Sequence, residues 1–302
     1  MNRTVLNATH VDLHTIERIS RAAAHPKSQQ IMIRGLLDSP AGYSALNIAV
    51  ARDDLRDAAL AAVRTLVERE IDVGRAWPGE AARWLSRARA DWQTSAALCN
   101  HLAWYARTRH QSVLLHLGGT DHVHRPGTDQ VHARALTHLH LAALRYDFRC
   151  RTITQLLDEA GEAQRTRWDP YTRALHTFAG LGQGRPGSLE SMERDLGTAG
   201  DNPQVCHALL HGLWLGDGLP DQAEHILRLA SWPTFDDHDP IMLFRTATAL
   251  RLLGRRADAL AAIDGALEAL APDQPEAHAD LVRERTMITR MPSATSTSGS
   301  LT

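Results

Sequence analysis

Residues 239–272 read DPIMLFRTATALRLLGRRADALAAIDGALEALAP and predict two consecutive helices. Asp239 suits the cap of the first helix because its carboxylate accepts hydrogen bonds from the first backbone amides, and Pro240 suits the first turn. Gly254 ends this helix, since glycine readily takes the left-handed conformation that follows many helices, and Pro272 ends the second helix. The apolar side chains of the second helix recur on one face, at Ala259, Ile263, Ala266 and Leu270.

The preceding segment, 202–233, has the same pattern of two helices separated by a short turn. Three small residues precede their counterparts by 36 positions, in the pairs Gly218 and Gly254, Ala223 and Ala259, and Ala230 and Ala266. Three positions that keep one interval indicate a repeated unit rather than a bias in composition. Further helical hairpins are predicted at 44–68, 129–161 and 169–196.

The stretch GRRADALAAIDGALEALAPDQPEAH (254–278) resembles a tetratricopeptide repeat. That family favours glycine before the second helix, small residues where this chain has Ala259 and Ala266, and proline after the second helix, here Pro272. The resemblance implies pairs of antiparallel helices. Each pair buries its apolar face only by stacking on its neighbours. We therefore expect an all-α fold, a right-handed α-solenoid of stacked helix–turn–helix repeats.

The predicted array spans 1–291 as one domain, degenerate over 1–200 and clearest over 202–291. The polar residues 292–302 predict a disordered tail.

The composition excludes several classes of protein. The chain has 302 residues, 43% of them hydrophobic and only 5% aromatic, which favours a helical core over sheets. A net charge of −2 with no basic stripe argues against a nucleic-acid partner. The cysteines Cys99, Cys150 and Cys206 lie far apart, so neither a zinc ribbon nor a disulfide scaffold is expected. No signal peptide or long apolar span is visible, and we expect a cytoplasmic protein with no membrane partner.

One acidic motif and one histidine motif leave an enzymatic alternative open. DDLRD (53–57) has the D-D-x-x-D form with which terpene and prenyl synthases hold magnesium, through Asp53, Asp54 and Asp57. The partner motif of those enzymes is absent, and acids in a hairpin turn also suit the start of a helix. His122 and His124 lie in a loop rich in glycine and proline, where H-x-H could bind a metal.

The pattern H-x5-H-x-H occurs twice, as His116, His122 and His124 and again as His132, His138 and His140. On a helix over 131–146, His132 and His140 are separated by about 12 Å along the axis. His138 is expected about 120° round from His132, on the outer side of the helix. These three side chains therefore cannot bind one ion.

The first helices of such repeats line a concave groove that binds a protein or peptide partner. Phe244, Thr248 and Arg251 are predicted to face this groove, with Ile241 at its mouth. One unit earlier the candidates are His207, His211 and Trp214, and core packing explains Trp214 better. His207 and His211 also have the spacing of a metal pair, but a zinc-protease helix needs Glu where Ala208 stands.

We therefore expect a non-catalytic binding scaffold without a cofactor. The scaffold could belong to a regulatory protein, because bacterial regulators often contain such arrays. The alternative is an all-helical metal-dependent enzyme that uses Asp53, Asp54 and Asp57 or His122 and His124. The oligomeric state is left open.

Overall fold

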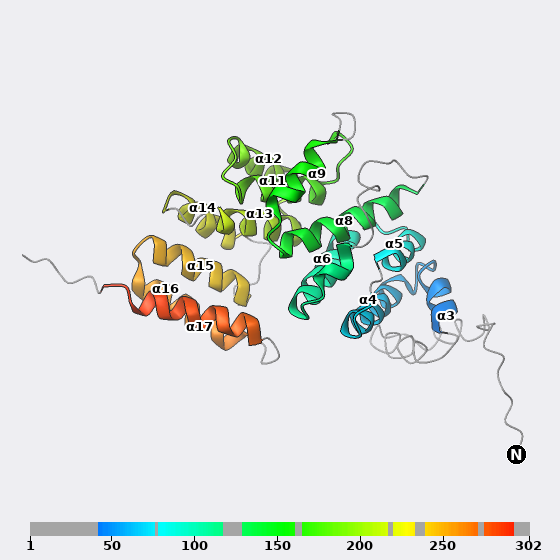
Figure 1. Cartoon of the computed structure of the whole chain (residues 1–302), viewed down its shortest axis with the longest axis horizontal. Coiled ribbons are helices and arrows are strands. Elements are labelled where there is room, and N and C mark those ends of the chain that lie inside the picture. The colour runs from blue at the N-terminus through cyan, green and yellow to red at the C-terminus, as the bar shows by residue number, and fades with distance from the viewer. Residues whose placement is uncertain are drawn as a thin grey trace, which may run out of the picture. The chain divides into compact units, whose positions relative to one another are not determined.

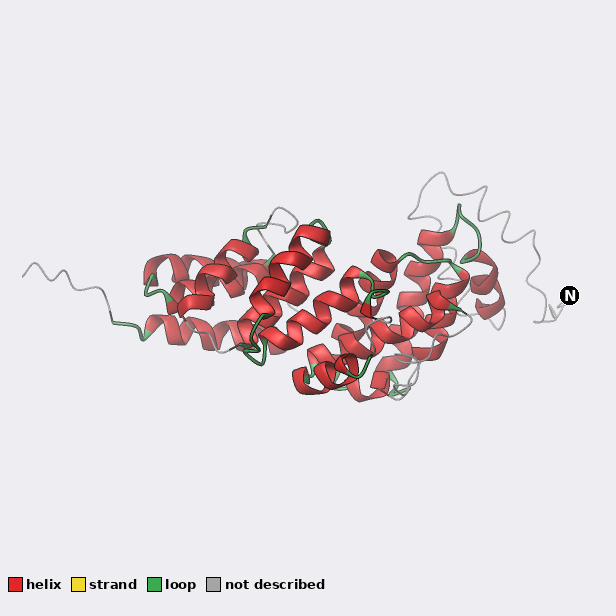
Figure 2. Cartoon of the chain, turned by 90° about the horizontal axis from the view of Figure 1, so that it is seen from above, coloured by secondary structure: helices red, strands yellow, loops and turns green. Residues whose placement is uncertain are grey.

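The computed structural model describes residues 42–75, 78–116, 129–160, 165–216, 220–232, 239–270 and 275–292. Within these ranges every regular element is a helix and no strand occurs (Figure 2), which confirms the all-α class. The right-handed solenoid stays a prediction. No helix in the described part of the chain combines the length and the apolar character that crossing a membrane requires.

The chain divides into two compact units, residues 1–172 and 173–302. Figure 1 labels their α-helices. The helices described in the first unit are α3 (Gly42–Ala49), α4 (Arg56–Asp72), α5 (Pro78–Arg87), α6 (Trp92–Thr108), the short 3₁₀ helix η1 (Ser112–His116), α8 (Gln130–Tyr146) and α9 (Cys150–Asp158). Those of the second are α12 (Ser188–Ala199), α13 (Pro203–Leu215), α14 (Pro220–Ala230), α15 (Pro240–Leu252), α16 (Arg256–Ala269) and α17 (Pro275–Thr289). Helix α11 (Pro170–Leu181) begins in the first unit and ends in the second. The single array over 1–291 stays a prediction.

Residues 239–270 contain the two predicted helices, α15 and α16, which pack against each other, and Pro272, predicted to end the second, lies outside the described residues. Asp239 caps α15, since its Oδ1 accepts hydrogen bonds from the amides of Ile241 and Met242 at 2.8 and 3.3 Å. Gly254 follows α15 with a φ of +75°, the left-handed conformation expected at this position. The local rules for helix ends therefore hold at this hairpin.

Among the helices that the structure describes, six end in the same turn, although only three of these six have glycine there. The left-handed residues are Gly74, Arg89, His110, Phe148, Gly184 and Gly254. In each turn the amide of the next residue donates to the carbonyl five positions before it, which satisfies a carbonyl at the end of the helix. This shared turn lets each helix be followed at once by the next one.

Small residues allow the helices to approach closely. Ala247 on α15 and Ala259 and Ala266 on α16 are fully buried, so the predicted alanines lie between packed helices. The largest fully buried side chains elsewhere are Trp84 and Tyr171 in the first unit.

Candidate partner-binding face

Four aromatic rings form a continuous row across three alternate helices of the second unit. The ring centroids of Phe178 on α11 and His211 on α13 are 5.2 Å apart. Those of His211 and Trp214 are 6.2 Å apart, and those of Trp214 and Phe244 on α15 are 6.1 Å apart. We call Phe178, His211, Trp214 and Phe244 the ring row. Two of the predicted groove residues of α13 thus lie beside one of α15.

A glycine brings the first two helices of the ring row together. A Cβ added at Gly212 of α13 would lie 2.7 Å from the carbonyl oxygen of Phe178 and 2.8 Å from its Cα. Only a residue without a side chain permits this approach of α13 to α11. His211 and Trp214, three positions apart, then lie on one side of α13. The close backbone contact therefore positions the rings.

The guanidinium of Arg245 lies on the two outer rings of this row. Its Cζ is 3.7 Å from the centroid of Trp214 and 5.1 Å from that of Phe244. Both distances suit a cation–π contact. Trp214, Phe244 and Arg245 are all half-buried, so part of this cluster faces solvent. We call these three residues the anchor cluster.

Arg245 was not predicted from the sequence. The repeat mapping follows residues whose Cα positions face the groove, and Arg245 is one residue, or about 100°, away from Phe244 on the helix. Its long side chain reaches back to the rings, which spacing along the chain does not show. An arginine directly after an aromatic groove residue was the available signal.

The other predicted groove residues of α15 use their polar groups within the protein. Thr248 is buried and donates a hydrogen bond from Oγ1 to the carbonyl of Phe244 at 3.1 Å. Arg251 donates from Nε to Oε1 of Glu284 on α17 at 2.6 Å. Ile241 is 44% exposed. Their predicted role in binding stays a prediction.

The two histidines of α13 differ in exposure. His207 is half-buried, whereas His211 is buried within the ring row.

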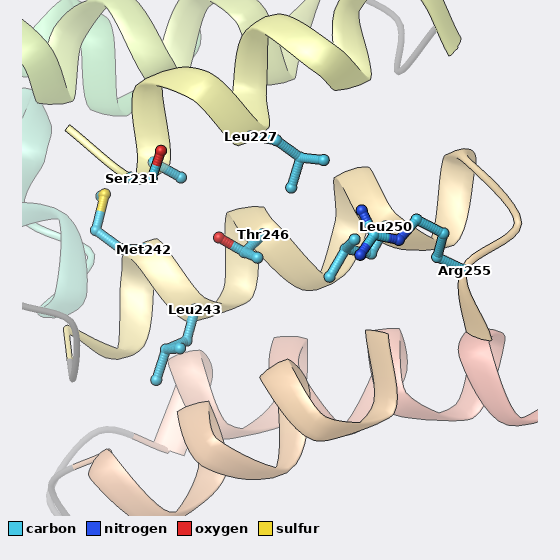
Figure 3. A pocket seen from close by; sticks show the side chains of 8 residues that line it. Leu227, Ser231, Met242, Leu243, Thr246, Leu250 and Arg255 are labelled. Carbon is cyan, nitrogen blue, oxygen red and sulfur yellow. The ribbon is translucent and has the colours of Figure 1, made fainter. Parts of the chain in front are cut away.

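A pocket of about 340 Å³ lies between α14 and α15. Figure 3 shows Leu227 of α14 and Ser231, which directly follows α14, on one side and Thr246 and Leu250 of α15 on the other. Its remaining lining residues are Ala230, Met242, Leu243 and Arg255. At about 100° per residue, its α15 residues are centred on roughly the opposite side of that helix from Phe244. The pocket and the anchor cluster are therefore separate features.

The acidic motif has arginine partners. Arg52 donates from Nε and Nη2 to the carboxylate of Asp54 at 3.0 and 2.9 Å. Arg56 pairs with Asp53. Asp57 lies in the first turn of α4, where an acid interacts favourably with the helix dipole.

Across the described residues no group of three or more His, Cys, Asp or Glu side chains is arranged to hold a metal. His122 and His124 lie outside the described residues.

The position predicted for His138 is wrong. Its side chain is fully buried rather than on the outer side of the helix, because it bonds to groups of α6 and of the segment that precedes α11. Its Nδ1 lies 2.9 Å from Oγ of Ser95, and its Nε2 lies 3.1 Å from both carboxylate oxygens of Asp169. His140 is also buried, and its ring packs instead against that of His116, with centroids 5.6 Å apart.

Ser95, His138 and Asp169 are the residue types of the catalytic triad of serine hydrolases, but the two ring nitrogens are exchanged. In the triad the serine bonds to Nε2 and the aspartate to Nδ1, whereas here Ser95 bonds to Nδ1 and Asp169 to Nε2 of His138. Ser95 and His138 have 0% exposure, so a substrate has no path to the serine oxygen. Burial on its own raises the pKa of Asp169, but the charge of His138 and the hydrogen bonds from His138 and Thr172 outweigh this effect. The pKa of Asp169 is therefore held well below its usual range. The three residues form a structural connection between helices.

Comparisons with models of protein families, with curated proteins and with solved structures find no match to this chain. The resemblance to tetratricopeptide repeats therefore rests on the residues of 254–278 and stays a prediction.

Proposed function

We propose that this chain is a non-catalytic scaffold that binds a protein or peptide on the side of α11, α13 and α15 that carries the ring row. The observation that carries the proposal is the anchor cluster of Trp214, Phe244 and Arg245, joined by contacts of 3.7 to 6.1 Å. Tryptophan, tyrosine and arginine dominate the binding energy of protein interfaces. The aromatic residues among them offer large contact areas at little entropic cost.

The proposal includes the arrangement that the repeat resemblance implies. In a right-handed solenoid, α11, α13 and α15 are the first helices of successive hairpins and line one concave surface. The resident contacts support a rigid face, because Thr248 bonds to its own helix and Arg251 ties α15 to α17. A preorganised surface loses less entropy on binding than a mobile one. A regulatory role would then be exerted through the bound partner.

A selection from a library of displayed random peptides tests the proposal on the full chain. Peptides that are enriched are measured by fluorescence anisotropy against the wild type and against Trp214→Leu and Phe244→Leu, which keep an apolar side chain. Leu189→Ala on α12 is the matched control, because Leu189 is also a large exposed apolar residue, at 38% exposure, but lies outside the ring row. Thermal unfolding followed by circular dichroism shows that each variant is folded.

We expect each ring variant to weaken binding at least tenfold, as loss of a central aromatic anchor does, and the control to change it by less than about twofold. Peptides that bind the wild type and both ring variants with equal affinity would contradict the proposed binding face.

A further inference from the structure

Arginines far outnumber acids along part of the first unit. Residues 92–116 and 130–157, which contain α6, η1, α8 and most of α9, hold six arginines and one carboxylate, that of Asp147. Its Oδ1 accepts a hydrogen bond from Oγ of Ser112 at 2.8 Å, and its Oδ2 lies 3.0 Å from Nε2 of His116. This part of the chain is therefore basic, although the whole chain has a net charge of −2.

Three of the six arginines are bonded within the chain. These are Arg109 with Asp72, Arg134 with the carbonyl of Ala90, and Arg145 with Asn100. In the part of the chain that the structure describes, the side chains of Arg107, Arg149 and Arg151 have no hydrogen bond, ion pair or ring contact. Arg149 and Arg151 are exposed, and Arg107 is half-buried. Their guanidinium donors are therefore available to a partner.

A bond between side chains brings these three arginines to one end of the helices. The contact of Ser112 with Asp147 joins η1, which follows α6, to the residue that follows α8. Arg107 lies in the last turn of α6, and Arg149 and Arg151 lie two and four residues after Asp147. The three arginines are therefore gathered where α6 and α8 end.

Two large apolar side chains lie among these arginines. Val113 directly follows Ser112 and is 62% exposed, and Phe148 directly follows Asp147 and is 51% exposed. Phe148 also has a φ of +58°, a conformation that is uncommon for a bulky residue and that glycine adopts in three other turns of this kind. We call Arg107, Val113, Phe148, Arg149 and Arg151 the basic edge.

We infer that the basic edge binds an acidic peptide segment of a partner protein, whose Asp or Glu carboxylates pair with the arginines and whose apolar side chains pack on Phe148 and Val113. Arginine pairs with a carboxylate through two parallel hydrogen bonds, so unpaired arginines favour carboxylates over neutral acceptors. The basic edge lies in the first unit. The inference therefore adds a second surface to the proposed function and does not depend on the ring row.

The number of unpaired arginines disfavours two other anionic partners. A large electrostatic affinity for nucleic acid comes from roughly six to ten phosphate contacts, at least twice what three arginines provide. Segments that are held on anionic membranes have clusters of about four to eight basic residues. Three guanidinium groups beside two exposed apolar side chains suit a short peptide better, because the ion pairs and the apolar contact act together.

Two matched libraries of displayed peptides test the inference. The acidic library has Glu at several fixed positions with random residues between them, and the neutral library has Gln at the same positions. Both are selected on the full chain carrying Trp214→Leu, so that the ring row does not contribute. The affinities of enriched peptides are then measured by fluorescence anisotropy against the wild type and against variants of the basic edge, at low and at raised sodium chloride.

The double variant Arg149→Gln, Arg151→Gln removes two charges, and Arg149→Lys, Arg151→Lys keeps them without the planar donors. Phe148→Gly removes the exposed ring and suits the positive φ. Thermal unfolding followed by circular dichroism shows that each variant is folded.

Arg87→Gln is the matched control. Arg87 is exposed, and its side chain has no partner among the described residues, like the arginines of the basic edge. It lies instead near the start of α8, because the neighbouring Ser86 donates to Asp129, which caps that helix.

We expect enrichment from the acidic library and none from the neutral one. Binding of the acidic peptides should weaken at least tenfold in the Gln double variant, to an intermediate degree in the Lys double variant, and with added salt. Phe148→Gly should weaken binding at least threefold without lowering the melting temperature. Arg87→Gln should change it by less than about twofold.

Three results would overturn the inference and leave the proposed function of the ring row standing. One is equal enrichment from the two libraries, or acidic peptides whose binding does not depend on Arg149 and Arg151. Another is binding of oligothymidylate or of phosphatidylserine vesicles that depends on the basic edge and is tighter than that of the peptides. The last is self-association in analytical ultracentrifugation that the Gln double variant abolishes, since the acidic helices α12, α14 and α16 of a second copy would then occupy the edge.

Discussion

Replacement of Asp169 tests two separate contributions to the buried connection between α8 and α11, which are a helix cap and a contact with His138. Its Oδ1 caps α11 by accepting hydrogen bonds from the amides of Tyr171 and Thr172, both at 3.0 Å. Its two oxygens also contact Nε2 of the fully buried His138 at 3.1 Å. Asp169→Asn retains a capping oxygen and removes the charge, whereas Asp169→Ala removes both.

The expected loss in the free energy of unfolding follows from these contacts. Loss of a helix cap costs about 1 kcal/mol. Removal of one partner of a buried charged pair costs about 3–5 kcal/mol, because the remaining group stays buried without its counter-charge. We therefore expect Asp169→Asn to lower the free energy of unfolding by about 3–5 kcal/mol at a pH at which His138 is protonated and Asp169 is ionised. Asp169→Ala should lower it by about 1 kcal/mol more.

The effect should depend on pH in a direction that the pKa of Asp169 sets. Burial raises this pKa, but His138 and the hydrogen bonds outweigh burial, so the pKa is lower in the folded chain than its ordinary value. Such a carboxyl stabilises the fold fully above the pKa of the unfolded chain, about 3.9. That stabilisation is lost as the pH falls from there toward the folded pKa. The difference between the wild type and Asp169→Asn should therefore shrink as the pH falls below about 4.

Urea unfolding followed by far-ultraviolet circular dichroism, at neutral pH and at several acidic pH values, measures these differences. Ser95→Ala is the companion variant, because it removes the hydrogen bond to Nδ1 of His138 and a long contact of 4.0 Å to Sγ of Cys99, and it should cost about 1 kcal/mol. If Asp169→Asn unfolds at the same urea concentration as the wild type at every pH above about 4, the charged pair does not stabilise the fold. If the two differ by an equal amount at every pH, the attribution of that stability to ionised Asp169 is wrong.

Three further outcomes are expected. Gly212→Ala should lower the free energy of unfolding by about 1–3 kcal/mol in thermal unfolding, because its Cβ would lie 2.7 Å from the carbonyl oxygen of Phe178. Unchanged stability would mean that α11 and α13 separate freely. Arg89→Gly should raise the free energy of unfolding by up to about 1 kcal/mol, because Arg89 has a φ of +50°. A decrease would show that the side chain of Arg89 stabilises the turn. A chelator should leave the melting temperature unchanged, and stoichiometric metal lost in a His122→Ala, His124→Ala double variant would contradict the scaffold proposal.

Much of the helical architecture could be predicted because helix ends are local. Asp239 and Gly254 act within a few residues, and α15 begins and ends beside them as predicted. Helices α5 and α6 were not predicted individually, although Pro78 begins the first and the carboxylate of Asp91 accepts from the amide of Thr94 at the start of the second. The sequence around α5 and α6 lacks the repeated small residues that indicated the later hairpins.

The candidate site could be predicted only in part, since its residues come from different helices. Phe244 and Trp214 followed from the repeat mapping, and the structure brings their rings together. Arg245 was missed because the direction of a long side chain is not set by its position on the helix. His138 was predicted on the wrong side, because its position was inferred from its angle to His132 on one helix, whereas its partner Asp169 lies 31 residues away.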